Sequence, residues 1–158
     1  MFKGKKAISE ITAFIFLTLL IVSGSTAAYF YSQGIIEDSI HSQDKEYMES
    51  FLRNLNYKIE NSLNFHGETF STPINFQSGT FVVRDNQVYY QSHTTFEQEE
   101  SVCVDGVCHV ASGGNERLYF NLTQPWEFSD NLTLIDGGSH ILTFELKENV
   151  SEIKVYAR

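Results

Sequence analysis

The 158-residue sequence has little of what enzymes and metal-binding proteins need. Its two cysteines alone do not complete the four-ligand shell of a structural metal site, although the nearby His109 would be a third candidate ligand. The histidines are scattered, with no His-x-x-x-His pair among them, at His41, His66, His93, His109 and His140. A Gly-x-Ser-x-Gly motif and a phosphate-binding glycine loop are both absent. We therefore expect no enzymatic activity, cofactor or metal.

Basic residues are also few, and they are distributed unevenly. Three of the 11 lysines and arginines precede Ser32, but only one of the 20 acidic residues does, which leaves a net charge of −11 on the rest of the chain. An acidic surface repels phosphate groups, so we expect this part to bind neither nucleic acid nor an anionic lipid surface.

One long apolar run dominates the N-terminus. From Ile11 to Tyr31 the chain holds 21 residues without a charge, roughly 31 Å of helix at 1.5 Å per residue, which matches the hydrocarbon thickness of a bilayer. Three lysines, at positions 3, 5 and 6, precede it. Lysines before a first membrane helix stay in the cytoplasm, so we expect a single-pass membrane protein whose remainder is extracellular.

Three N-glycosylation sequons favour an exported surface. They are Asn121-Leu122-Thr123, Asn131-Leu132-Thr133 and Asn149-Val150-Ser151.

A cleaved secretory signal is the alternative interpretation of this N-terminus. Such a signal has roughly 7–15 apolar residues followed by a small-residue cleavage site, and the stretch 23–28 could serve as one. Here the apolar run is longer. The small residue Ala7 instead lies before the run, directly after Lys5 and Lys6.

The stretch Lys5-Lys6-Ala7-Ile8-Ser9-Glu10-Ile11 resembles the class III signal of archaeal type IV prepilins. The resemblance implies that a prepilin peptidase cuts after Ala7, which makes residues 1–7 a leader and leaves Ile8 first in the mature chain. Many type IV pilins carry a glutamate as fifth mature residue. Cleavage after Ala7 makes Glu10 third, and cleavage after Gly4 would make it sixth.

Glu10 is predicted to have a role in assembly. At i, i+4 spacing it can pair with Lys6 in the precursor. Cleavage removes that lysine and creates an α-amino group, which on this subunit or a neighbour could neutralise the carboxylate and favour stacking in register. The alternative is an interfacial carboxylate satisfied by Lys6 and water.

The apolar run also contains a patch of small residues. Ser23 with Ala27, and Gly24 with Ala28, form two small-xxx-small pairs on adjacent helix faces. Small side chains let helix backbones approach closely within a membrane. We expect residues 8–31 to pack against copies of this chain or other pilin subunits, whereas a lone anchor would merely tolerate the patch.

Residues 32–66 are predicted to form an amphipathic helix. Its apolar positions follow an i+3, i+4 rhythm, at Met48, Phe51, Leu52, Leu55, Ile59 and Leu63. Residues 67–158 are predicted to form a small antiparallel β-sandwich or barrel head of seven or eight strands, so the fold class is α+β.

Four segments supply most of the predicted strands. Residues 80–91 read as two strands around Asp85-Asn86, and residues 132–146 as two strands around Gly137-Gly138. Single strands are predicted at 116–121 and 151–156.

The two cysteines are predicted to form a disulfide. In Cys103-Val-Asp-Gly-Val-Cys108 the Asp105-Gly106 pair suits a two-residue hairpin turn. The valines then face each other, and the cysteines form the next pair outward, within disulfide reach. An oxidising exterior allows the bond.

Together these features predict a pilin-like structural subunit, processed by a prepilin peptidase and assembled into a type IV pilus-type filament at the cell surface. The alternative is a surface β-domain held permanently by an uncut membrane helix, such as an archaellum stator-type subunit that binds the surface-layer protein.

Overall fold

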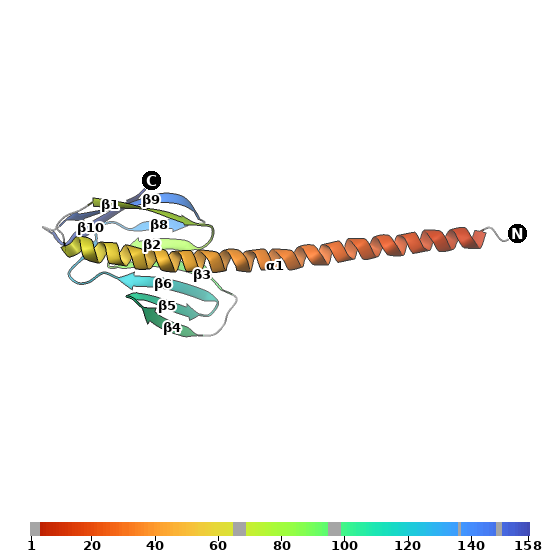
Figure 1. Ribbon diagram of the computed structural model, residues 1–158, viewed down its shortest axis with the longest axis horizontal. Coiled ribbons are helices and arrows are strands. Elements are labelled where there is room, and N and C mark those ends of the chain that lie inside the picture. The colour runs from red at the N-terminus through yellow and green to blue at the C-terminus, as the bar shows by residue number, and fades with distance from the viewer. Residues whose placement is uncertain (1–3, 65–68, 95–98, 136, 148–149) are drawn as a thin grey trace. The chain divides into compact units, whose positions relative to one another are not determined.

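The computed structural model describes residues 4–64, 69–94, 99–135, 137–147 and 150–158, with side chains from Ile11 on except at 37–38 and 63–64 (Figure 1). The fold is α+β: one helix, α1 (Gly4–Asn64), precedes a sheet-rich region. The described strands are β1 (Thr69–Phe76), β2 (Thr80–Arg84), β3 (Gln87–His93), β4 (Glu100–Val104), β5 (Val107–Ser112), β6 (Asn115–Asn121), β7 (Glu127–Phe128), β8 (Leu132–Ile135), β9 (Gly138–Lys147) and β10 (Glu152–Ala157).

The chain divides into two compact units, Met1–Ser39 and Ile40–Arg158. The first contains the N-terminal part of α1. The second, which we call the head, contains the rest of α1 and all the described strands.

The head contains two sheets. One has the strand order β1-β9-β10-β7 and the other the order β4-β5-β6-β3-β2-β8. All the described pairings are antiparallel except that between β10 and β7, which is parallel, so the prediction of a purely antiparallel head is wrong at this point. The described strands also exceed the predicted seven or eight.

The two strands predicted around Asp85-Asn86 are confirmed as β2 and β3, and the two predicted around Gly137-Gly138 are confirmed as β8 and β9, which do not pair with each other. Strand β8 pairs with β2, whereas β9 pairs with β1 and β10 of the other sheet. Both glycines have positive φ, and a Cβ on Gly137 would lie 2.5 Å from the carbonyl oxygen of Phe76. At these glycines the chain passes from one sheet to the other, close to the backbone at the end of β1. A residue with a side chain would obstruct this close approach.

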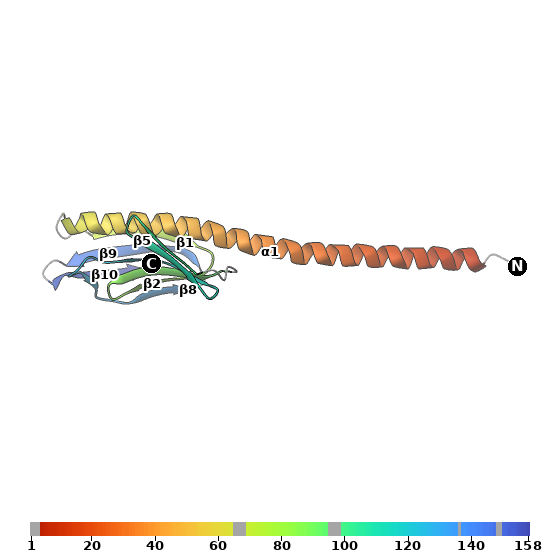
Figure 2. The same ribbon diagram turned by 90° about the horizontal axis from the view of Figure 1, so that it is seen from below.

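The C-terminal part of α1 lies along the strands of the head (Figure 2). It shares one hydrophobic core with both sheets. Its predicted apolar stripe is buried from Met48 to Ile59: Met48 and Leu52 are fully enclosed, and Phe51, Leu55 and Ile59 nearly so, whereas the side chain of Leu63 lies outside the described residues. The four-stranded sheet contributes Ile74, Phe76, Leu142 and Phe144, among others, and the six-stranded sheet contributes Phe81, Val88, Leu118 and Phe120. The amphipathic helix is thus a structural part of the head.

A buried carboxylate lies on the same stripe, one turn before Met48. Oδ2 of Asp44 accepts hydrogen bonds from the backbone N–H groups of Gln77 (2.9 Å) and Ser78 (2.8 Å) and from the Ser78 hydroxyl (3.0 Å). The Tyr90 hydroxyl donates to the Ser78 carbonyl at 2.9 Å, and burial raises the pKa of that phenol. This network attaches α1 to the turn between β1 and β2.

A second polar cluster joins α1 to β5 and β6. The buried Glu116 carboxylate pairs with the Lys45 ammonium group and with Nε2 of His109. A buried carboxylate is costly without such partners, so Lys45 and His109 make the position of Glu116 tolerable.

Replacing Asp44 by Ala should destabilise the head by about 2–3 kcal/mol, because three donors then lose a charged acceptor in a buried site. Urea unfolding of the full chain, followed by tyrosine fluorescence, measures the change. The matched control is Glu46→Ala, since Glu46 is exposed two residues further along the same helix. Equal stabilities of the two variants would contradict the structural role of Asp44.

Candidate assembly segment and head surface

The N-terminal part of α1 has no covering of its own. All side chains from Ile11 to Ile36 are exposed, including Phe14 at 69%, Leu20 at 69% and Phe30 at 66%. This is the one helix among the described residues that is long and apolar enough to span a membrane, with a mean hydropathy of 2.0 over its most apolar window. Contiguous apolar surface of this extent marks a site for lipid or for another protein chain.

Several hydroxyl groups in this segment donate hydrogen bonds to carbonyl groups of the same helix. Thr18 donates to the Phe14 carbonyl at 2.8 Å and Thr26 to the Val22 carbonyl at 2.8 Å. Ser23 likewise donates to the Leu20 carbonyl at 3.1 Å. In a bilayer core an unpaired hydroxyl costs several kcal/mol, so these bonds fit the segment for an apolar environment.

The predicted small-residue patch is exposed on this helix. Ser23 and Ala27 are one turn apart, as are Gly24 and Ala28, and all four lie open. A Cβ built on Gly24 would meet no atom within 4 Å. The glycine therefore has no packing role within the described part of its own chain and leaves room for a neighbouring helix.

The predicted processing and pairing residues fall at the start of α1. The backbone of Lys5, Lys6, Ala7, Ile8 and Glu10 is helical, whereas their side chains lie outside the described residues.

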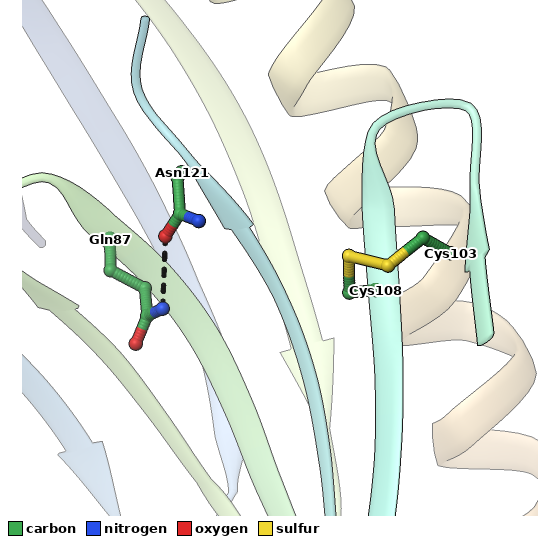
Figure 3. The surroundings of a disulfide bond; sticks show 4 residues. All are labelled: Gln87, Cys103, Cys108 and Asn121. Carbon is green, nitrogen blue, oxygen red and sulfur yellow. Dashed lines mark hydrogen bonds between the residues drawn. A yellow bond between two sulfur atoms is a disulfide. The ribbon is translucent and has the colours of Figure 1, made fainter. Parts of the chain in front are cut away.

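The predicted disulfide between Cys103 and Cys108 is present (Figure 3). It joins β4 to β5 in the expected register, with Val104 opposite Val107 and a Cα–Cα distance of 4.0 Å between the cysteines. Asp105 and Gly106 form the turn, both with positive φ. Among the described residues no group of three His, Cys, Asp or Glu side chains could hold a metal ion.

The turn of this cystine hairpin lies against α1. The Arg53 guanidinium contacts the Asp105 carboxylate at 3.4 Å, and a Cβ on Gly106 would lie 2.8 Å from Nδ2 of Asn56. Sequence analysis missed Asp44 and Asn56 as docking residues. A signal was available, because both fall on the helix face of the apolar stripe: Asp44 precedes Met48 by four residues and Asn56 precedes Ile59 by three.

Two of the three sequons lie on the six-stranded sheet. Asn121 ends β6 and Asn131 directly precedes β8, and both are exposed. Asn121 pairs with Gln87, and Gln87 pairs with Arg84. Arg84 directly follows Val83, whose partner Leu132 directly follows Asn131. The two asparagines therefore lie at the same end of this sheet. Asn149 lies outside the described residues.

Comparison with known protein families, with curated protein sequences and with solved structures gives no match for this chain. Its function is therefore argued from its own residues.

The disulfide generates a prediction for protein taken from the native cell surface. Neither Cys103 nor Cys108 should react with a thiol reagent until a reductant is added. The double variant Cys103→Ser, Cys108→Ser should be less stable by about 2 kcal/mol, because the bond closes a short loop and removes little chain entropy. Alkylation with mass detection, with and without reductant, checks the first point and urea unfolding the second. Full labelling without reductant would contradict the prediction.

Proposed function

We propose that this chain is a pilin-like structural subunit of an extracellular filament of the type IV pilus kind. The observation that carries the proposal is the contrast within α1. From Ile11 to Ile36 the helix is apolar and uncovered, whereas from Met48 to Ile59 it contributes one stripe to the closed core of the head. A subunit of a helical filament needs such a division, because one segment must bury its surface between subunits while the head remains folded alone.

The small-residue patch supports helix-driven assembly. Apolar helices in a membrane gain no hydrophobic free energy from each other, so close backbone contact has to supply the attraction. Four exposed small residues on adjacent faces of the segment allow such contact: Ser23, Gly24, Ala27 and Ala28. The partners would be copies of this chain or related subunits.

The chemistry of the head supports an extracellular position. The lysines before the apolar run favour a cytoplasmic N-terminus, and the head carries a disulfide, which persists in oxidising surroundings. Its acidic charge keeps it soluble and away from anionic lipid. We propose that its two sheets, which share one core, form a sandwich.

A permanently anchored surface domain, such as an archaellum stator-type subunit bound to the surface layer, would use the same helix without cleavage. The fate of residues 1–7 distinguishes the two functions.

The native mature chain should begin at Ile8. N-terminal sequencing by mass spectrometry of protein isolated from its own membrane measures this directly. Replacing Lys5 and Lys6 by Ala should leave the uncut precursor, because the basic flank would be lost to the peptidase, whereas Lys58→Ala on the head should be processed normally. A wild-type chain that retains Met1 would rule out the processed pilin and favour the anchored domain.

The double variant Gly24→Leu, Ala28→Leu should insert into the membrane but fail to enter filaments, because leucines there hold helix backbones apart. Electron microscopy and sedimentation of sheared filaments measure incorporation. The matched control is Thr18→Leu, Val22→Leu, which adds leucine at the same spacing, roughly 170° around the helix from the centre of the patch of Ser23, Gly24, Ala27 and Ala28.

A truncated chain that begins at Ser32, and so contains the whole head, should remain folded and monomeric in the same assays. Polymerisation of that head alone, or normal incorporation of the Gly24→Leu, Ala28→Leu variant, would contradict assembly through the helix.

A further inference from the structure

The outer face of the six-stranded sheet, which points away from the shared core, carries a shallow hollow of about 520 Å³ over β3, β5 and β6. Most of its lining is uncharged and polar or aromatic, and the remainder is the aliphatic Val110 with two charged residues: Gln87, Gln91, Ser112, Asn115, Tyr119 and Asn121, then Val110, Arg117 and Glu116. The Glu116 carboxylate is engaged by Lys45 and His109. Among the described residues, Arg117 is thus the charged side chain of the hollow that has no ion-pair partner, on a head that carries a net negative charge.

The side chains of the hollow hold one another in place. Nη2 of Arg117 donates to Oε1 of Gln91 at 3.3 Å, and its guanidinium lies 4.4 Å from the centroid of the Tyr89 ring. Nε2 of Gln87 donates to Oδ1 of Asn121 at 2.9 Å (Figure 3). Side chains that are already ordered lose less conformational entropy when a ligand binds.

We propose that this hollow is a saccharide-binding site. A pyranose ring presents vicinal hydroxyls, each both donor and acceptor, and the planar amide and guanidinium groups of Gln87, Gln91 and Arg117 offer the matching in-plane partners. Its C–H faces pack on aromatic rings, and Tyr119 supplies one inside the hollow. The volume lies within the range of small-ligand sites and suits one or two sugar rings.

The saccharide has two possible sources, one of them on this chain. Asn121 lines the hollow and begins the sequon Asn121-Leu122-Thr123. Because Oδ1 of Asn121 accepts the bond from Gln87, its Nδ2 is the atom turned away from that glutamine, and Nδ2 is where an N-linked sugar attaches (Figure 3). Tyr119, two residues earlier in the strand, faces the same side and could pack against the first sugar. The other source is a free or foreign saccharide.

The first experimental arm tests the attached source and depends on export of the head. Protein from its native membrane is digested, and the occupancy of Asn121 is measured by mass spectrometry. If a sugar is present, Asn121→Gln in the otherwise wild-type chain should lower the Tm of the head by about 2–5 °C. In a chain that already carries Tyr119→Ala, the same substitution should lower the Tm by much less. Asn131→Gln is the matched control, because Asn131 does not line the hollow. Equal effects of Asn121→Gln in both backgrounds would overturn the proposal for an occupied Asn121.

The second arm tests the free source if Asn121 carries no sugar. The full unglycosylated chain, held in lipid nanodiscs to avoid sugar-based detergents, is titrated with glucose, mannose, galactose, N-acetylglucosamine and glucuronate and followed by NMR. At least one should shift the Arg117 side-chain signals with a millimolar Kd, weakened about fivefold or more in Tyr119→Ala. Tyr156→Ala, on β10, should bind as the wild type does.

An unmodified Asn121 together with no shift from any sugar up to about 50 mM would overturn the proposal. Binding that Tyr119→Ala leaves unchanged would also overturn it. Neither result bears on the pilin-like function, which is decided by the N-terminus and by the helix variants.

Discussion

The head depends on the burial of one stripe of α1 between Met48 and Ile59. These side chains enter the same core as the inward faces of both sheets, so the helix supplies apolar surface that each sheet would otherwise expose to water. Full burial of a leucine-sized side chain contributes on the order of 2 kcal/mol, and several such residues act together here. This stripe of the helix is therefore required for the head to fold.

This requirement explains why the two parts of α1 differ in composition. A helix that is apolar on every side suits lipid or a bundle of other helices, whereas a helix with one apolar stripe suits the surface of a domain. In α1 the first pattern covers Ile11–Ile36 and the second covers Met48–Ile59. Because the two sets of residues do not overlap, a substitution in the first set need not destabilise the head.

Polar contacts fix the position of α1 on the head more specifically than apolar burial can. Asp44 binds the turn between β1 and β2, Lys45 pairs with Glu116 on β6, and Arg53 contacts the turn of the cystine hairpin. Hydrophobic contact is non-directional, but each of these pairs requires a particular rotation and register of the helix. The same arrangement leaves the outer face of the six-stranded sheet open, where Arg117, Gln91 and Gln87 are ordered by one another.

The sequence by itself determined the local features: the apolar run, the amphipathic stripe, the β2–β3 pair and the cystine hairpin. Each depends on neighbours within a few residues, through helical or strand periodicity or through turn residues such as Asp105-Gly106. Only the tertiary structure decided that β8 and β9 belong to different sheets, that β10 pairs in parallel with β7, and that the outer face of β3, β5 and β6 is hollowed. The physical reason is that the surfaces that meet in the core decide which distant strands pair and whether a polar residue such as Asp44 is buried. The periodicity of residues along the chain does not predict which surfaces meet.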